Sequence, residues 1–454
     1  MAARPTPLSG FPEWLPAQRI VEQYVLDSLR RTFELWGFAS LETRAVEPLD
    51  QLLRKGEIDK EVYVLRRLHA AEGDDDDDDA RRLGLHFDLT VPFARYVLEN
   101  AGHLHFPFRR YQIQKAWRGE RPQEGRFREF VQADVDVVGV GDLPFHHEVE
   151  VALVVVDALS ALREIGVPPF RIQVNNRKVV EGFYRGLGLE DVAGVLRTVD
   201  KLDKIGPDAV REILVAEAGA SPAQAAACLE LAGIRGQDAS VVDRVSALGV
   251  EHALLTEGLA ELARVVDAAA AHAPGTVVAD LRIARGLDYY TGTVYETVLE
   301  GHEDLGSICS GGRYDALAGD GKQTYPGVGL SVGVSRLVSR IIGRGLAVAS
   351  RSVPTCVLVA VGSEEDRAAC DAIAADLRRR GIPVEVAPSA AKFGKQIRHA
   401  DRRGIPYVWF PQAGGGHEVK DIRSGDQVPA NPGTWTPPAG DLLPRVAPSR
   451  STPS

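Results

Sequence analysis

Charged and aromatic side chains concentrate in one stretch of the chain, residues 109–140. Arg118, Glu120 and Arg126 fall in a segment with a Pro and two Gly between two period-two patterns, and Phe130 follows Arg126 at a spacing of four. The stretch therefore predicts two strands joined by a long charged loop. At strand ends an Arg can hold a phosphate, while an aromatic face and a second Arg can sandwich a flat base. A solvated turn is the alternative, but charges of both signs begin inside the strand pattern, which favours nucleotide binding on an antiparallel sheet.

A second stretch that could do chemistry, residues 285–292, has the sequence Arg-Gly-Leu-Asp-Tyr-Tyr-Thr-Gly. The backbone beside a Gly can approach a ligand closely and a guanidinium can hold an anion through two hydrogen bonds, so Arg285 is a candidate anion-binding residue. Residues 310–315, Ser-Gly-Gly-Arg-Tyr-Asp, form another glycine-rich approach. Asp88 and Thr90 stand two residues apart, where a carboxylate and a hydroxyl can together hold a primary ammonium; a plain turn residue is the alternative for Asp88.

The elements that must position these residues follow from hydrophobic periodicity. Apolar residues recur at helical spacing over 19–36, and a strand-like segment follows over 38–46. Two further strand patterns, 62–68 and 83–89, flank an acidic run that is predicted to be a solvated hairpin tip. Residues 327–337 predict a glycine-rich strand that leads into a helix with an Arg near its start. The functional stretches are therefore expected on a sheet with helical cover.

Taken together, these motifs resemble one known family. Residues 117–120, Trp-Arg-Gly-Glu, followed by a loop and then Arg126-x-x-x-Phe130, resemble motif 2 of the class II aminoacyl-tRNA synthetases. The stretches 284–292 and 310–315 resemble signatures of a single family in that class, the histidyl-tRNA synthetases. Residues 327–337 resemble class II motif 3, and the N-terminal helix and strand resemble motif 1, which forms the dimer interface in the family. The resemblance spans nearly the whole chain.

The resemblance implies an enzyme that uses ATP to convert L-histidine to histidyl-adenylate and transfers the histidyl group to the 3' end of tRNA-His. It assigns Arg118 and Arg285 to catalysis, as cations at the α-phosphate. The ATP-binding residues that it implies are Arg118, Glu120, Arg126, Phe130, Arg285 and Arg336. Magnesium is expected on the outer phosphates of ATP, and no protein side chain is assigned to it.

Selection of histidine has its own physical logic. A neutral imidazole presents one N–H donor and one acceptor, so a carboxylate and a tyrosine hydroxyl can recognise both. The histidine-binding residues implied by the resemblance are Asp88, Thr90, Gln132, Asp136, Tyr289, Tyr290 and Tyr314. Of these, Asp136, Tyr290 and Tyr314 are expected at the ring, whereas Asp88 and Thr90, with Gln132, are expected at the amino-acid backbone. Where the family commonly has Arg just before Asp-Leu-Thr, this chain has His86.

Changes of pattern along the chain predict separate domains. Residues 1–175 and 279–345 carry the motifs and are expected to form an α+β catalytic core on an antiparallel sheet flanked by helices. Residues 176–278 are expected to form an inserted helical subdomain. Residues 354–430 alternate strands with helices, which predicts a small α/β domain; its basic and aromatic residues suit RNA, and the resemblance implies that it binds the anticodon. Residues 431–454 are expected to be a Pro-rich tail.

Composition bounds the cellular context. The chain has 454 residues, of which 44% are hydrophobic and 26% charged, as expected for a soluble protein of two or three domains. No apolar run is long enough for a membrane span and the N-terminus lacks the pattern of a signal peptide, so a cytoplasmic protein is expected. Four scattered Cys predict neither disulfides nor a zinc site. The net charge of -10 argues against indiscriminate nucleic-acid binding, although local basic surfaces remain compatible with it.

Two other classes of protein remain as alternatives. A histidine-binding regulatory paralogue of an ATP phosphoribosyltransferase would lack the anticodon domain and carry degraded signatures, whereas both are intact in this chain. A synthetase-like RNA-binding module without catalysis would be expected to lose Arg118 or Arg285. The sequence hypothesis is therefore an active homodimeric histidine–tRNA ligase.

Overall fold

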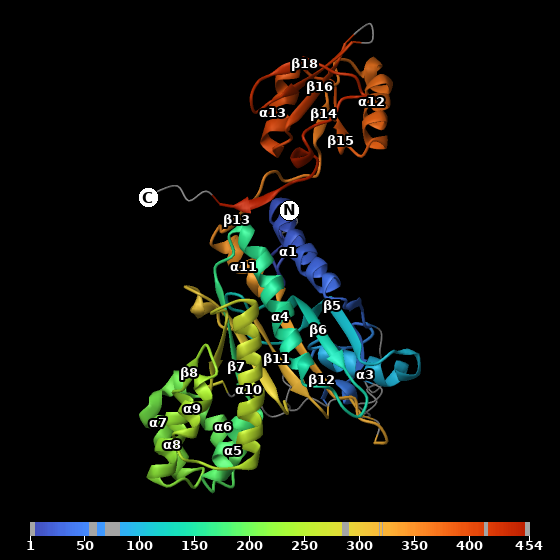
Figure 1. The fold of residues 1–454 in the computed structure, drawn as a ribbon. Helices are drawn as coiled ribbons and strands as arrows, with labels where there is room; N and C mark the ends of the chain where they lie inside the picture. The colour runs from blue at the N-terminus through green and yellow to red at the C-terminus, as the bar shows by residue number, and fades with distance from the viewer. Residues whose placement is uncertain are drawn as a thin grey trace. The chain divides into compact units, whose positions relative to one another are not determined.

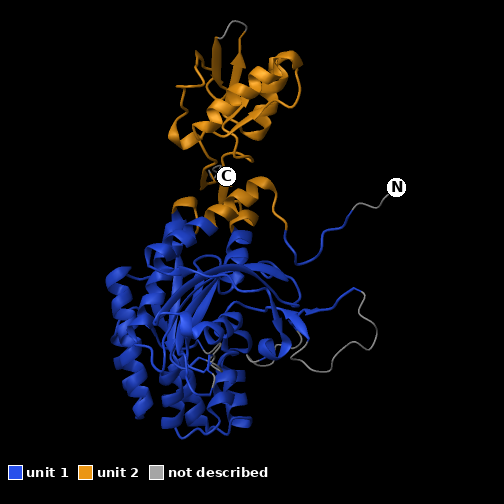
Figure 2. Ribbon diagram, turned by 90° about the vertical axis from the view of Figure 1, so that its right-hand side faces the viewer, with its two compact units in different colours: residues 1–12, 26–163, 168–340 blue, residues 13–25, 164–167, 341–454 orange. Residues whose placement is uncertain are grey.

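The computed structural model describes residues 5–53, 61–68, 82–283, 290–316, 318–319, 321–412 and 416–449. The chain divides into two compact units, shown in different colours in Figure 2. Unit 1 comprises residues 1–12, 26–163 and 168–340, and unit 2 comprises residues 13–25, 164–167 and 341–454. The acidic run expected as a hairpin tip lies outside the described residues.

A nine-stranded sheet forms the centre of unit 1. In spatial order its strands are β1 (Ala39–Ser40), β5 (Phe108–Trp117), β6 (Glu129–Val138), β12 (Gly327–Gly333), β11 (Cys309–Tyr314), β10 (Thr293–Leu299), β7 (Phe170–Asn176), β9 (Val277–Asp280) and β8 (Arg235–Gly236). All neighbours from β5 to β7 are antiparallel, whereas β1–β5 and β7–β9 are parallel. The predicted antiparallel sheet is confirmed.

The predicted hairpin is the pair β5–β6. Its register joins Trp117 to Glu129 at the loop end and Arg110 to Asp136 near the other end. Alternate residues of a strand point to opposite faces, and the neighbours Arg109 and Arg110 show this directly. Arg109 forms an ion pair with Glu150 of helix α4 (His146–Ala161), at 2.6 Å, whereas Arg110 is fully buried on the other face. One face of the hairpin is thus covered by helix, and the opposite face carries the polar residues.

Helices flank this sheet. Helices α4 and α10 (Ala253–His272) run beside one another along it (Figure 1). The remaining helices of the catalytic motifs are α1 (Pro16–Leu35), α2 (Leu49–Leu52), α3 (Thr90–Asn100) and α11 (Val334–Gly343). A small sheet in the order β2 (Val46–Pro48), β4 (Leu83–Leu85), β3 (Val64–Leu65) precedes α3. The first turn of α3 is capped by the side chain of Asp88, whose Oδ1 accepts a hydrogen bond from the Val91 amide at 3.1 Å.

A group of helices lies between β7 and β9 in the sequence. They are α5 (Arg177–Gly186), α6 (Val192–Val199), α7 (Leu202–Ala216), α8 (Pro222–Ala232), α9 (Ser240–Ser246) and α10. Helix α7 is kinked where Gly206, with φ 80°, precedes Pro207, which cannot continue a helical hydrogen-bond ladder. Helices α5 and α10 cross closely because both carry Gly there; a Cβ on Gly258 would lie 2.6 Å from the Val179 amide nitrogen.

Unit 2 contains a five-stranded sheet in the order β15 (Val384–Val386), β14 (Val357–Val359), β16 (Tyr407–Pro411), β17 (His417–Asp421), β18 (Gln427–Pro429). The first three strands are parallel and the last two are antiparallel hairpin partners. Helices α12 (Arg367–Arg379) and α13 (Phe393–Arg403) connect the parallel strands, so the predicted C-terminal α/β domain is confirmed. The core of this sheet includes Trp409, which is fully buried.

The chain after residue 430 packs onto unit 2. Trp435 stacks edge-on against Tyr407 and Trp409, with ring centroids 5.3 and 5.6 Å away. Asp441 is buried and accepts a hydrogen bond from the Tyr407 hydroxyl at 2.8 Å. Strand β19 (Val446–Pro448) then pairs with β13 (Ala347–Ala349). These contacts attach the end of the described chain to the body of its unit.

Candidate active site

The open face of the β5–β6–β12 sheet carries a row of polar side chains. Gln132, Asp134 and Asp136 alternate along β6 and share one face. Across the register, Asp136 lies opposite Arg110 of β5, and Asp134 lies opposite Ser331 of β12. Apolar residues fill the alternate positions, since Ala133, Val135 and Val137 are all fully buried. Strand periodicity therefore builds a polar floor on the face that helix α4 does not cover.

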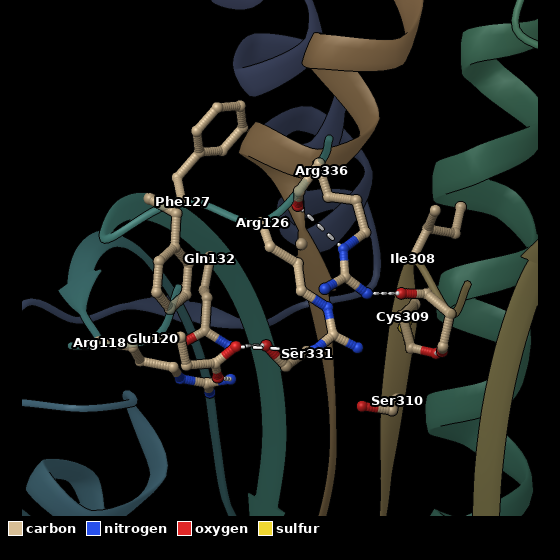
Figure 3. A pocket seen from close by; sticks show the side chains of 14 residues that line it. Arg118, Glu120, Arg126, Phe127, Gln132, Ile308, Cys309, Ser310, Ser331 and Arg336 are labelled. Atoms are coloured by element: carbon tan, nitrogen blue, oxygen red, sulfur yellow. Dashed lines mark hydrogen bonds and ion pairs between the residues drawn. The ribbon is translucent and has the colours of Figure 1, made fainter. Parts of the chain in front are cut away.

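A cavity of about 300 Å³ opens over the loop end of this floor (Figure 3). Five residues predicted to bind ATP line it: Arg118, Glu120, Arg126, Phe130 and Arg336. Gln132, predicted to bind the histidine backbone, also lines it. Arg336 is separated from Arg118 by 218 positions in the sequence and reaches the cavity from the start of α11, because β12 pairs with β6. The fold thus brings together residues from motif-like stretches that are distant along the chain.

Positive charge dominates this cavity. Three guanidinium groups, of Arg118, Arg126 and Arg336, face one carboxylate, Glu120, which lies 3.9 Å from Arg118 and 3.6 Å from Arg126. Burial and the neighbouring guanidinium groups of Arg126 and Arg118 lower the pKa of Arg336. Like charges held together in this way are relieved by a bound anion. The cavity is therefore suited to a polyanionic group such as a triphosphate.

The backbone fixes the position of Arg336. Its Nε donates to the Gly125 carbonyl at 3.1 Å, and its Nη1 donates to the Ser307 carbonyl. Gly125 adopts φ +71°, a conformation that favours glycine, and a Cβ there would lie 2.5 Å from the Leu305 side chain. The loop that carries Arg126 is thereby held against the start of α11.

Arg118 lies between two aromatic rings. Its Cζ is 4.2 Å from the centre of the Phe87 ring and 5.1 Å from that of Phe130, and its Nε donates to the Phe87 carbonyl at 3.2 Å. Phe87 was not among the residues predicted from the sequence. It is adjacent to Asp88, a predicted residue, but an isolated Phe in a predicted strand carries no signal that separates a ligand contact from core packing.

A second, smaller cavity of about 30 Å³ lies farther along the same floor. Four predicted histidine-binding residues line it: Thr90, Asp136, Tyr290 and Tyr314. Ser310 and Ser331 line both cavities, so the two spaces adjoin. Asp88 lines neither cavity; it is 3% exposed and caps α3. Arg285 and Tyr289, which were predicted to bind substrate, lie outside the described residues.

The carboxylate of Asp136 is held from two sides. Its Oδ1 accepts a hydrogen bond from the Tyr314 hydroxyl at 2.8 Å, and its Oδ2 forms an ion pair with Arg110 Nη2, also at 2.8 Å. Burial, and next the charge of Asp136, raise the pKa of Tyr314 well above its usual value, so this hydroxyl stays protonated and donates. Gly329 lies opposite Asp136 and leaves room for it, because a Cβ there would be 2.1 Å from Oδ1.

Comparison with known proteins decides the family. Residues 10–337 match the family model described as histidyl-tRNA synthetase, and residues 355–410 match the model described as an anticodon binding domain.

The chain belongs to the histidyl-tRNA synthetase family.

Relatives agree with this membership over nearly their whole length. A histidine–tRNA ligase of Micrococcus luteus is 65% identical over 458 residues, covering 98% of this chain and 99% of the relative. A histidine–tRNA ligase of Cutibacterium acnes is 62% identical, covering 98% and 99%. The crystal structure of histidyl-tRNA synthetase from a Nostoc species superposes with a TM-score of 0.82 at 34% identity, covering 94% and 97%. The predicted family, fold class and histidine–tRNA ligase activity are confirmed.

A regulatory paralogue was the main alternative to a synthetase. A Bacillus halodurans structure described as an ATP phosphoribosyltransferase regulatory subunit/histidyl-tRNA synthetase has a TM-score of 0.70 but only 21% identity, so it shares the fold alone. The anticodon binding domain match favours the synthetase over the regulatory paralogue.

Arg110 and Asp134 were not among the residues predicted from the sequence. Arg110 is buried and pairs with Asp136, which lines the smaller cavity, and Asp134 lines the same cavity. The available signal was strand periodicity: Asp134 lies midway between two predicted residues on the same face. No group of three or more potential metal-ligating side chains occurs among the residues that the structure describes. Within the same ranges, no helix is long and apolar enough to cross a bilayer.

Proposed function

We propose that the two adjoining cavities on the polar face of the sheet bind ATP and L-histidine for adenylate formation. The observation that carries the proposal is the convergence of Arg118, Arg126 and Arg336 in a cavity that shares Ser310 and Ser331 with the cavity of Asp136 and Tyr314. Adjacent anion and amino-acid sites are what in-line attack of a carboxylate on a phosphate requires.

In the first step, a carboxylate oxygen of histidine forms a bond to the α-phosphorus of ATP, and the bond from that phosphorus to the pyrophosphate oxygen breaks. Arg118 neutralises the α-phosphate, and Arg126 and Arg336 hold the outer phosphates, so charge that develops in the transition state meets preorganised cations. Arg285 supplies a further cation at the α-phosphate. Catalysis then depends mainly on positioning and charge stabilisation.

The adenine ring is held by Glu120 and Phe130. A carboxylate accepts a hydrogen bond from the exocyclic amino group of adenine, and an aromatic ring offers a flat stacking surface. We expect Mg²⁺ to be held by the outer phosphates of ATP, because Mg²⁺ in nucleotide sites is bound chiefly by phosphate oxygens and water. Glu120 is the single carboxylate among the residues that line the described cavity, which fits a metal held by the substrate.

Histidine is recognised at both of its ends. Asp136 and Tyr314, with Tyr290, form the ring-binding end, where a carboxylate and hydroxyl groups match the donor and acceptor of a neutral imidazole. Asp88, Thr90 and Gln132 hold the amino-acid backbone, and Tyr289 completes the set of histidine-binding residues. A ribose hydroxyl at the 3' end of tRNA-His then attacks the carbonyl carbon of the adenylate, and AMP leaves.

The domain assignment is also part of the proposal. Residues 1–175 and 279–345 form the catalytic core, and residues 176–278 form a helical insertion that approaches the tRNA acceptor stem. Residues 354–430 bind the anticodon of tRNA-His, and residues 431–454 form the Pro-rich C-terminal segment. The protein works as a homodimer in the cytoplasm. Sedimentation of the purified protein tests the oligomeric state directly, and a monomer at assay concentration contradicts the dimer.

Histidine-dependent ATP–pyrophosphate exchange tests the activation step. Exchange is expected with histidine alone among the amino acids, and Arg285→Ala is expected to abolish it because a cation at the α-phosphate is lost. The matched control is Arg211→Ala, on the exposed face of α7, where the guanidinium pairs with Asp208 at 3.0 Å. Histidine binding without exchange in the wild-type protein would instead support the regulatory paralogue.

A further inference from the structure

Asp134 is a buried carboxylate in the histidine-side cavity to which the proposed mechanism gives no role. It lies on β6 between Gln132 and Asp136, on the same face as both, and only 2% of its surface is exposed. It lines the cavity together with Thr90 and Tyr290. Alternate residues on a strand are about 6.6 Å apart. Asp134 therefore lies between the residue proposed for the amino-acid backbone and the residue proposed for the imidazole.

The protein leaves this carboxylate short of donors. Among the described residues, Asp134 Oδ1 has no hydrogen-bond partner. Among the described residues, the Arg110 guanidinium lies closer to Asp136 than to Asp134: its Nη2 is 2.8 Å from Asp136 Oδ2 but 4.0 Å from Asp134 Oδ2. A buried carboxylate oxygen without a donor is costly. The cost is offset if a ligand supplies the missing donor.

The groups that face Asp134 come from each neighbouring element. They are Arg110 of β5, Asp136 of β6, Asp88 before α3, Cys309 and Tyr314 of β11, and the Ser331 hydroxyl of β12. Burial, reinforced by the charges of Asp136 and Asp88 and opposed by Arg110 and the Ser331 hydroxyl, raises the pKa of Asp134 to about 7. Among the described groups near Asp134, Asp136 and Asp88 contribute negative charge and Arg110 contributes positive charge. A cation bound beside Asp134 would favour its ionised form.

We propose that Asp134 binds the α-ammonium group of the substrate histidine, together with Thr90 and Asp88. This inference rests on the proposed function of the cavity and makes it more specific. An ammonium group has three N–H donors and so requires three acceptors. The carboxylates of Asp134 and Asp88 and the hydroxyl of Thr90 supply them.

A proton should be released when histidine binds. With a pKa of about 7, the Asp134 carboxyl is partly protonated at pH 7 in the free protein, and a bound ammonium favours its ionised form. The wild-type protein is therefore expected to release more protons at pH 7 than a variant that cannot ionise here. Protons lost by the ligand itself are the same for both proteins and cancel in the difference.

Asp134→Asn tests this inference by calorimetric titration with three ligands. Histidine and histidinol carry the amino group, whereas imidazolepropionate retains the ring and carboxylate but lacks it. The variant is expected to bind histidine and histidinol roughly 10- to 100-fold more weakly and imidazolepropionate within about twofold of wild type. Titration in two buffers of different ionisation enthalpy gives the proton count. Asp142→Asn, at an exposed position, is the matched control.

Two outcomes would overturn the inference. Equal weakening of all three ligands means that Asp134 acts as a structural partner of Arg110, and unchanged affinity with unchanged proton release means that it does not meet the ligand. If Asp134→Asn does not fold, Asp134→Ser is titrated in its place. The proposed function fails by a separate observation, namely absence of pyrophosphate exchange in the wild-type protein, which these binding measurements do not use.

Discussion

Adding one methyl group at Gly329 should disable histidine binding while leaving the larger cavity, proposed to bind ATP, intact. A Cβ at this position would lie 2.1 Å from Oδ1 and 2.4 Å from Cγ of Asp136, and 2.7 Å from the backbone carbonyl oxygen of Val135. Side-chain carbons essentially never approach other heavy atoms so closely. In Gly329→Ala the carboxylate of Asp136 must therefore leave its place, and the β6 backbone must shift with it.

The magnitude follows from what Asp136 would lose. Its carboxylate makes a hydrogen bond with Tyr314 and an ion pair with Arg110, each at 2.8 Å. Loss of one such charge-assisted contact costs about 1.5–3 kcal/mol, and overpacking a tight site costs about 1–3 kcal/mol. If binding of the imidazole loses the same 1.5–3 kcal/mol, the histidine KM rises roughly 10- to 150-fold.

The assay is ATP–pyrophosphate exchange as a function of histidine and, separately, of ATP. The ATP KM is expected to stay within about twofold of wild type because Gly329 is not among the residues that line the cavity proposed to bind ATP. Gly343→Ala in α11 is the control, since no neighbouring atom lies within 4 Å of the added Cβ. A histidine KM that Gly329→Ala leaves unchanged would refute the reasoning.

Three other perturbations give separate readouts. Arg336→Ala should raise the ATP KM at least about tenfold with a smaller effect on the histidine KM, because one of three phosphate-facing cations is lost; an unchanged ATP KM in pyrophosphate exchange contradicts this. Asp304→Ala removes the carboxylate 2.7 Å from Arg340 Nη2 and leaves Glu124 at 3.4 Å, so urea unfolding should show a loss of about 1 kcal/mol, and wild-type stability would argue against it. In unit 2, hydrogen bonding from Arg423 lowers the pKa of Asp441 from 3.8 to about 2, so its contribution is present above about pH 4 and is lost as the pH falls towards 2. Near-UV circular dichroism during acid titration should show this loss, up to about 2 kcal/mol, in the wild-type protein but not in Asp441→Asn; identical acid transitions in the two proteins would exclude it.

Local patterns allowed much of this protein to be predicted. Period-two alternation between Arg109 and Val140 predicted the hairpin, because burying one face of a strand forces every second residue to be apolar. The charged segment with Arg118 and Arg126 interrupts that alternation. The interruption predicted a loop, and its charges indicated nucleotide binding. The sequence also indicated the helical segment between β7 and β9 and the C-terminal domain in which strands alternate with helices. Both could be predicted because apolar residues recur at a different spacing in helices and in strands.

Only the tertiary structure decided which distant residues meet. The register of β6 against β12 brings Arg336 beside Arg126, and a shift of a single residue would turn every side chain to the other face. The burial of Arg110 and the missing donor of Asp134 likewise depend on three strands at once. Nothing in the local sequence distinguishes Arg110 from its neighbour Arg109, which pairs with a helix on the opposite face. The hydrophobic periodicity of the sequence thus determined which segments form helices and strands. The pairing of distant strands determined which charged side chains meet in the site.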